Sequence, residues 1–496
     1  MKRPILLHGV DREAIRGIGS RLVELIGGEV RDLLDASVDQ VLEAYRMGGG
    51  SLGLVSSEVM LTRATRIELL SRATVVWVQA EAGTGALIGL GGASVSEGAQ
   101  AWLSGAVASD LGECHLRVAC GGGVTEVEIA KAIAEVASRE GVLVAARDRS
   151  YLVEVCRGGL ERGLSALDAR CPVFFYVTDA NVERLHGARL AGALDQMGGR
   201  VVRHVLVPGE ERKCLDTLGE MFDTALDGGI DRTSWLVAAG GGVTTDVGGL
   251  VAALWMRGLK WVAIPTTLLA MVDASVGGKT AVDHGKGKNA VGAFWQPSRV
   301  VCDVDFVTTE SERNYVGALS EVVKTAVIGD SGLFELIDGQ AARVLGRDLD
   351  VMLEVVQRCV RVKARIVGLD ELESGLRAVL NFGHTVGHAL EALGEYRRYT
   401  HGEAVSLGMI AALRLGARLG HTAPTVAVRV EGLLKKLGLP VTLDRDELVA
   451  AAELLGHDKK RAGSALRFVF ARDVGDVRTE RIALQDVREL VGSLCD

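Results

Sequence analysis

Three of the ten histidines in this 496-residue chain, His384, His388 and His401, lie close together in the sequence. Arg377, Asn381, His384 and His388 follow one another at steps of four, three and four residues. If this segment is helical, the spacing places all four side chains on one face. A polar stripe on an otherwise apolar helix must face a wet cleft, a metal ion or a partner, because burying it unpaired costs several kcal/mol.

Imidazole and carboxylate groups are ligands of catalytic zinc, which keeps one coordination position open. Glu321 lies three residues before Lys324, so a helix would place both on one face. Two histidines together with Glu321 would form such a zinc site. Spacing alone does not decide which histidines bind, although His384 and His388, four residues apart, are the simplest choice. The alternative is a set of structural histidines.

A glycine-rich segment, Gly240 to Gly242, follows the apolar run 235–239. The dinucleotide-binding fingerprint would need glycine or alanine where Thr245 stands, and a Walker phosphate loop would need glycine where Asp273 stands, so neither motif is complete. Backbone N–H groups of the glycines can still approach an anion, and Asp246 can accept a ribose or amide hydrogen bond. The alternative is a tight turn with packing glycines.

Two lysines, Lys279 and Lys288, lie in glycine-flanked turns between the segments 265–267 and 294–297. Their ammonium groups could meet a phosphate or a carboxylate. Solvated surface lysines are the alternative, but a glycine-rich loop held between two ordered segments favours a ligand clamp.

The elements that must position these residues follow from the apolar pattern. The continuous apolar runs 173–177 and 235–239 predict a parallel sheet buried on both faces. After about residue 310 a helical period dominates, for instance over 351–367 and 376–393. Upstream, short runs such as 75–78 and 142–144 predict strands of a separate α/β layer, and a capping box at 125–128 begins a helix that continues through Ser138. We therefore expect three domains, with bounds 1–160, 172–305 and 306–496.

The composition excludes several classes of protein. The net charge is −8, the pI is about 5.8 and no run of five or six like charges occurs, so nucleic acid is not expected as a partner. The eight cysteines include no Cys-x-x-Cys pair and the first residues lack a signal-peptide pattern, which together favour a cytoplasmic protein. No apolar stretch is long enough to predict a membrane span.

Many separate segments from about residue 172 onward resemble the 3-dehydroquinate synthase family. They are Thr178-Asp179-Ala180-Asn181, Pro208 to Lys213, Gly240 to Asp246, Met256-Arg257-Gly258, Pro265 to Leu269, Val272 to Thr280, Gly287-Lys288-Asn289, the histidine segment, His401 to Val405, and Asp458-Lys459-Lys460. The resemblance implies a Rossmann-like α/β nucleotide-binding domain, a C-terminal all-α metal-binding domain and a homodimer. It also implies NAD and zinc, or cobalt in its place, as cofactors.

The resemblance also assigns site residues. It gives the metal to Glu321, His384 and His401, and it moves His388 to the substrate. The residues implied to hold NAD are Asp179, Asn181, Glu210, Lys213, Gly241, Gly242, Val243, Asp246, Thr266 and Thr267. Those implied to surround the substrate are Asp273, Lys279, Lys288, Asn289, Lys324, Arg377, Asn381, His388 and Lys459, with Arg257 reaching the substrate phosphate from the partner subunit. Thr245 and Ala274 depart mildly from the family pattern.

The implied reaction converts 3-deoxy-D-arabino-heptulosonate 7-phosphate to 3-dehydroquinate and phosphate, a step of the shikimate pathway. It proceeds through transient oxidation by NAD, phosphate elimination, reduction and intramolecular aldol closure. A related sugar-phosphate cyclase of secondary metabolism would share the zinc ligands and the NAD loop, but Arg377, Asn381 and His388 match the dehydroquinate-forming branch. A metal-dependent polyol dehydrogenase would have no use for Lys279 and Lys288.

Residues 1–160 faintly resemble shikimate kinase in the order of their strands. The segment after His8-Gly9 is Val10-Asp11-Arg12-Glu13, with no Gly-Lys-Ser/Thr, so it has no backbone cradle or lysine for ATP phosphates. We expect a small degenerate kinase-like α/β domain without kinase activity.

Overall fold

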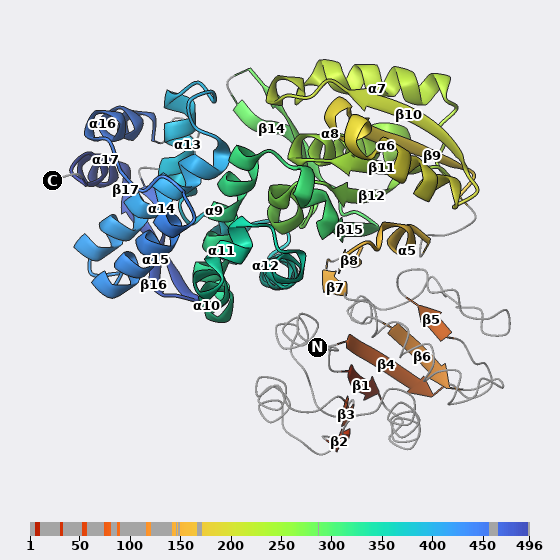
Figure 1. The fold of residues 1–496 in the computed structure, drawn as a ribbon, viewed down its shortest axis with the longest axis horizontal. Coiled ribbons are helices and arrows are strands. Elements are labelled where there is room, and N and C mark those ends of the chain that lie inside the picture. The colour runs from red at the N-terminus through yellow and green to blue at the C-terminus, as the bar shows by residue number, and fades with distance from the viewer. Residues whose placement is uncertain are drawn as a thin grey trace.

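The computed structural model describes part of the chain, and every structural statement below refers to that part (Figure 1). It comprises six short strands between residues 5 and 120, residues 141–144 and 146, and the segments 149–165, 171–285, 287–455 and 465–494.

The six N-terminal strands form one sheet. They are β1 (Ile5–Gly9), β2 (Val30–Asp32), β3 (Leu52–Ser56), β4 (Thr74–Ala80), β5 (Leu87–Gly89) and β6 (Leu116–Cys120), in the order β2-β3-β1-β4-β6-β5. All pairings are parallel except that of β5 with β6. The strand expected at 75–78 is confirmed as part of β4. The helix expected over 125–138 lies outside the described residues.

A second sheet of seven strands forms the centre of the next domain (Figure 1). Its order is β10 (Arg200–Leu206), β9 (Val173–Asp179), β11 (Trp235–Gly240), β12 (Lys260–Pro265), β15 (Arg299–Asp303), β8 (Tyr151–Cys156) and β7 (Gly141–Val144). Only β7 is antiparallel to its neighbour. Every residue of β11 is buried, as expected for a parallel sheet covered on both faces.

Helices cover this sheet: α5 (Leu160–Ser165), α6 (Ala180–Asp195), α7 (Leu215–Asp227) and α8 (Gly242–Leu254). We call this part of the chain the sheet domain, which comprises the described residues between 141 and 311. It also contains a hairpin of β13 (Lys279–His284) and β14 (Gly287–Phe294) and the short helices η2 (Glu210–Arg212), η3 (Trp255–Arg257), η4 (Ala270–Ala274) and η5 (Val304–Thr309).

The expected domain boundary near residue 160 is wrong. Strands β7 and β8 belong to the seven-stranded sheet, where Val153 of β8 pairs with Val300 of β15. Val153 and Leu160 are fully buried in the core of that domain. Short apolar runs look alike in sequence whichever sheet they join, and the partner strand β15 lies about 150 residues further along, so the local pattern carried no sign of the pairing.

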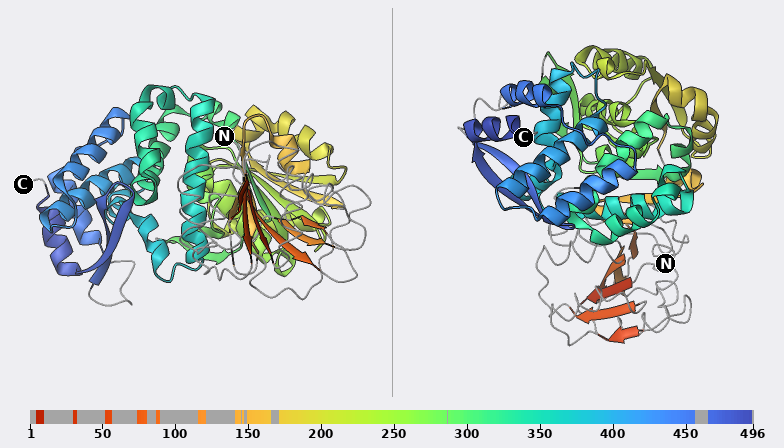
Figure 2. Two further views of the ribbon diagram at one scale, coloured as in Figure 1. Left: turned by 90° about the horizontal axis from the view of Figure 1, so that it is seen from below. Right: turned by 60° about the vertical axis from the view of Figure 1, so that its left-hand side comes forward.

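The described residues between 312 and 494 form a helical domain beside the sheet domain (Figure 2). Its helices are α9 (Glu312–Gly329), α10 (Ser331–Gly339), α11 (Ala341–Leu345), α12 (Leu349–Leu369), η6 (Leu376–Asn381), α13 (His384–Leu393), α14 (His401–Arg418), α15 (Pro424–Lys436), α16 (Arg445–Leu454) and α17 (Leu484–Gly492). An antiparallel hairpin of β16 (Ala465–Asp473) and β17 (Asp476–Ala483), which the helical pattern did not predict, packs against α14. No described helix is both long and apolar enough to span a membrane.

Candidate functional site

Three helices of the helical domain bring Glu321, His384 and His401 together. Glu321 lies in the middle of α9, His384 is the first residue of α13 and His401 is the first residue of α14. The Nε2 atoms of His384 and His401 lie 3.4 Å and 3.6 Å from Glu321 Oε1. Their ligand-type atoms all lie within 4.8 Å of one another, a spacing that suits one metal ion.

The single helix that would carry Arg377, Asn381, His384 and His388 on one face does not exist. A 3₁₀ helix, η6, ends at Asn381, and α13 begins only after Gly383, which has a left-handed φ of 81°. A Cβ atom on Gly383 would also lie 2.9 Å from the carbonyl oxygen of Val405, so glycine is needed for both conformation and packing. The break separates the two histidines of α13 from the two polar residues of η6.

The Glu321 carboxylate presents one oxygen to the two imidazoles. Its side chain is fully buried; Oε2 pairs with the Lys324 ammonium, whereas Oε1 faces the Nε2 atoms of His384 and His401. Burial raises the pKa of Glu321, but Lys324, which pairs with Oε2, and His384 lower the pKa to about 2. The group is therefore ionised, with Oε1 facing two imidazoles, and this donor set fits a divalent metal.

The two histidines offer the same nitrogen. His384 Nδ1 lies 3.2 Å from the carbonyl oxygen of Phe382, and His401 Nδ1 lies 3.4 Å from both carboxylate oxygens of Glu391. For His384, an N–H donated from Nδ1 leaves the lone pair on Nε2, the atom that faces Glu321. Burial lowers the pKa of His401, but its hydrogen bonds to Glu321 and Glu391 raise the pKa to about 10, so a metal ion bound here would have to displace the proton on Nε2. Burial, followed by Lys324, lowers the pKa of His384 to about 3, so this ring is neutral, as a metal ligand must be.

A second group with metal-type spacing consists of His388, Glu391 and His401. Lys288 Nζ lies 3.6 Å from Glu391 Oε1, so an ammonium group already faces this carboxylate. No group in the described residues joins His384 and His388 in one ligand set, although their rings are in edge contact with centroids 5.2 Å apart. The simplest choice from spacing, His384 with His388, is therefore not the arrangement found.

The glycine-rich segment lies where the order of the sheet reverses. The chain passes from β9 outward to β10 and then back to β11 on the other side of β9, so the carboxyl ends of β9 and β11 form the switch point at which α/β sheets bind ligands. Asp179 at the end of β9 caps α6 by accepting the N–H groups of Asn181 and Val182, and it accepts the Thr244 hydroxyl at 3.4 Å. Gly241 caps α8 without a side-chain hydrogen bond, which leaves that helix start open to an anion.

Two further features at this edge fit a dinucleotide. Lys213 Nζ lies 2.6 Å from Asp246 Oδ2, and burial raises the pKa of Asp246, partly offset by Lys213. The buried Thr266 hydroxyl, at the end of β12, has no hydrogen-bond partner in the described structure. Unpaired buried polar atoms are costly, so a ligand group here would satisfy Thr266.

The helix η4 joins this edge to the metal group. Its Ala274 lies next to Gly242 at the start of α8, where an added Cβ would be 3.6 Å from Ala274 Cβ. Its Asp273 accepts from Lys363 of α12 at 2.5 Å, and the charges of Lys324 and His384 act on Asp273 as well. The nucleotide edge and the metal group therefore meet across one short helix.

Polar groups expected around a substrate line the same region. Lys279 of β13 pairs with Glu373, whose other oxygen accepts from Asn381 Nδ2 at 3.1 Å. Arg377 donates to the carbonyl oxygen of Gly277 at 3.1 Å, and the N–H of Gly277 donates to the hydroxyl of Tyr151 at 2.8 Å.

Residues 203–317 match the family model described as 3-dehydroquinate synthase N-terminal, and residues 318–461 match the one described as 3-dehydroquinate synthase C-terminal. The 3-dehydroquinate synthase of Pelobacter propionicus is 40% identical over 345 residues, which cover 70% of this chain and 94% of that relative. The chain belongs to the 3-dehydroquinate synthase family. The Caulobacter vibrioides member of this family is 43% identical over 339 residues, which cover 66% of this chain and 91% of that relative.

Solved structures of related cyclases share the fold. A 2-deoxy-scyllo-inosose synthase complexed with carbaglucose-6-phosphate, NAD⁺ and Co²⁺ has a TM-score of 0.64 at 26% identity, covering 71% of this chain and 99% of that one. The 2-epi-5-epi-valiolone synthase of Streptomyces hygroscopicus with NAD⁺ and Zn²⁺ bound has a TM-score of 0.63 at 28% identity, covering 71% and 98%. These similarities support the assignment of a Rossmann-like domain followed by a helical one.

Not every residue implied by the family resemblance joins the site in this chain. Arg257 is exposed at the far end of α8 and has a left-handed φ of 65°. Asn289 is exposed in the hairpin, with its N–H donated to Asp283 at 2.6 Å. Lys459 lies outside the described residues. Asn181 and Glu210 are exposed at the nucleotide edge, and Val243 and Thr267 are half-buried there.

The structure adds site residues that the sequence analysis missed. Lys363 is buried against Asp273, Glu373 links Lys279 to Asn381, and Glu391 lies beside His401. The sequence did carry a signal for Lys363, because a lysine on the apolar face of α12 needs a partner. It carried one for Glu391 as well, since that residue continues the helical stripe of His384 and His388.

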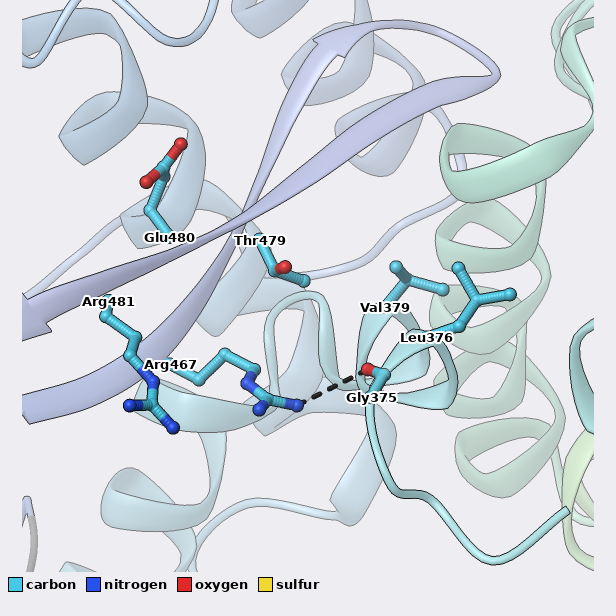
Figure 3. A pocket seen from close by; sticks show the side chains of 7 residues that line it. All are labelled: Gly375, Leu376, Val379, Arg467, Thr479, Glu480 and Arg481. Atoms are coloured by element: carbon cyan, nitrogen blue, oxygen red, sulfur yellow. Dashed lines mark hydrogen bonds between the residues drawn. The ribbon is translucent and has the colours of Figure 1, made fainter. Parts of the chain in front are cut away.

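A separate cavity of about 460 Å³ lies between η6 and the β16–β17 hairpin (Figure 3). Arg467 and Arg481, paired across the hairpin, line it, and Arg467 donates to the carbonyl oxygen of Gly375 at 3.3 Å. None of the residues predicted for the site lines this cavity.

Proposed function

We propose that this protein is a 3-dehydroquinate synthase, which converts 3-deoxy-D-arabino-heptulosonate 7-phosphate to 3-dehydroquinate and phosphate. In this reaction a secondary alcohol is transiently oxidised, phosphate is eliminated, the ketone is reduced again and an aldol addition closes the ring. The observation that carries the proposal is the meeting of an open nucleotide edge and a three-ligand metal group across η4.

Two cofactors belong to the proposal, NAD at the β9–β11 edge and zinc, or cobalt, at Glu321, His384 and His401. Glu321 Oε1 and the two Nε2 atoms that converge on it support the metal, and the open start of α8 and the unpaired Thr266 hydroxyl support NAD. Bound zinc would polarise the substrate hydroxyl group, while NAD would take up and return the hydride.

The residues of this chain would orient the substrate. Lys279, Lys288 and Arg377 offer positive charge to a phosphate and a carboxylate, and Asn381 offers an amide. These groups lie on both domains, so a substrate bound between them would be held from two sides. With its charges fixed and water excluded, the substrate's own phosphate could accept the proton that is lost before elimination.

Arg257 supports a homodimer as part of the proposal. Its exposed side chain stands at the opposite end of α8 from Gly242, about 20 Å away along a helix of this length. It therefore cannot serve the site of its own chain and is free to reach the phosphate in a partner's site. We further propose that the protein acts in the cytoplasm.

The direct test is phosphate release from 3-deoxy-D-arabino-heptulosonate 7-phosphate, with identification of the product. We expect 3-dehydroquinate, no net NADH, and loss of turnover with a chelator. Glu321→Gln should remove both activity and bound zinc. A metal- and NAD-loaded protein that ignores this substrate but turns over sedoheptulose 7-phosphate would refute the proposal in favour of a related cyclase.

A further inference from the structure

Glu391 is a buried carboxylate that lies between the metal group and the other domain. It is on α13, three residues beyond His388, and its side chain is 3% exposed. His401 approaches it from α14, and Lys288 approaches it from β14 of the sheet domain. A buried carboxylate with two cationic or N–H partners is fixed in place and can fix them in turn.

The first role of Glu391 is to orient the His401 ring. The Nε2 atom lies 3.6 Å from Glu321 Oε1, whereas Nδ1 lies 3.4 Å from both oxygens of Glu391. An imidazole that binds a metal must be neutral, with one N–H and one lone pair, so donation from Nδ1 to Glu391 leaves the lone pair on Nε2, the atom that faces Glu321. His384 achieves the same with a backbone carbonyl, because its Nδ1 lies 3.2 Å from the oxygen of Phe382.

The second role of Glu391 is to hold the Lys288 side chain in place. Its Nζ lies 3.6 Å from Glu391 Oε1 and 3.4 Å from Glu210 Oε1, and it stands over the Tyr396 ring at 4.6 Å. Lys288 thus spans from the nucleotide-binding side to the helical domain. Glu391 is the buried end of that connection, since Glu210 is exposed.

We infer that Glu391 is a positioning residue, which orients His401 with Nε2 towards the metal and holds Lys288 beside the substrate. The inference rests on the proposed function, because it takes Glu321, His384 and His401 as the metal ligands. In the alternative, Glu391 is itself a ligand together with His388. That arrangement would place a divalent cation beside the Lys288 ammonium, and like charges at such distances repel.

Zinc affinity tests the first role without any turnover. We compare Glu391→Gln and Glu391→Ala with the wild-type protein by competition against a chromophoric chelator. Loss of a carboxylate that orients a metal-bound histidine weakens affinity by about 10- to 100-fold, and we expect this for Glu391→Ala. Glu391→Gln should lose less, because its amide oxygen can still accept from Nδ1. Glu395→Gln, the same exchange on an exposed residue just beyond α13, serves as the control and should leave affinity unchanged.

The absorption spectrum of the cobalt-loaded protein separates positioning from ligation. A positioning role predicts that Glu391→Gln has the wild-type spectrum at saturating cobalt, since all three ligands remain. The second role predicts a higher KM of Glu391→Gln for the sugar phosphate, because the charge that holds Lys288 is gone.

Three results would overturn the inference. Zinc affinities of Glu391→Gln and Glu391→Ala within twofold of wild type would remove the positioning role. A changed cobalt spectrum in Glu391→Gln would make Glu391 a ligand instead. A wild-type protein that takes up no zinc would refute the proposed function itself. If Glu391→Ala does not fold, Glu391→Gln decides the outcome.

Discussion

A single methyl group at Gly402 should disable the metal site without touching a ligand. Gly402 follows His401 in the first turn of α14, and it packs against Gly317 of α9, which lies one turn before Glu321. A Cβ atom at Gly402 would lie 1.9 Å from the Gly317 oxygen and 2.3 Å from its carbonyl carbon. Both neighbours are backbone atoms, so neither can rotate away.

The required displacement follows from these distances. Non-bonded heavy atoms are comfortable at about 3.5 Å, so α14 and α9 must separate by about 1.5 Å in Gly402→Ala. Metal–ligand distances tolerate only about 0.2 Å, and overpacking of this kind costs about 1–3 kcal/mol or more. The helices that carry His401 and Glu321 therefore move apart by several times the tolerance of the site. We expect zinc affinity to fall by at least about tenfold, together with a lower melting temperature.

Gly432→Ala is the matched control. Gly432 lies within α15 of the same domain, and an added Cβ there would meet nothing within 4 Å. Alanine in a helix interior is favoured over glycine by about 0.5–1 kcal/mol, so this variant should melt slightly higher and bind zinc normally. Zinc titration and thermal unfolding of both variants are the assay. A Gly402→Ala protein with wild-type zinc affinity would show that the Gly317–Gly402 contact does not set the ligand spacing.

Three further predictions concern pH, the cofactor and the domain boundary. Burial raises the pKa of Glu310 to about 7, above its value in the unfolded chain, so the protein loses stability as the pH rises and this carboxyl ionises. Between pH 5.5 and 8 the loss in the free energy of unfolding is about 2 kcal/mol, and Glu310→Gln should abolish it. Thermal unfolding across this pH range measures the effect, and a pH profile identical to that of the wild type would contradict the prediction. Lys213→Met leaves Asp246 buried and unpaired, so NAD binding measured by calorimetry should weaken by about tenfold or more while the zinc content stays normal. An NAD affinity equal to that of the wild type would argue against NAD binding at the β9–β11 edge. Deleting residues 1–139 should leave a folded, active enzyme, whereas deleting 1–165 removes β7 and β8 and should give insoluble protein; an active 1–165 deletion would refute the corrected boundary.

The apolar pattern predicted the parallel sheet and the helical last third, and the family resemblance named the three residues that the structure brings together with metal-type spacing. What the sequence could not supply was long-range pairing. Strand β8 was assigned to the wrong domain because its partner β15 is distant in the chain. The stripe of Arg377, Asn381, His384 and His388 suggested one helix, because the period is right on both sides of a break that depends on Gly383. Periodicity reports which residues share a face only while the backbone stays regular.

The same limit explains why spacing pointed to two histidines that share no metal-type group in the described residues. His384 and His388 share a helix, but Glu321, His384 and His401 come from three helices. The spacing of these helices depends on glycines, which have no side chain and so allow backbone atoms to come into direct contact. Added Cβ atoms at Gly402 and Gly408 of α14 would each lie 1.9 Å from a carbonyl oxygen, that of Gly317 on α9 and that of Gly383 before α13. These glycines let α14 approach both neighbours closely enough for Nε2 of His401 to lie 3.6 Å from Glu321 Oε1. The glycines beside the ligands are therefore as much a part of the site as the ligands. Substitution of Gly402 or Gly408 should weaken metal binding while the rest of the fold remains intact.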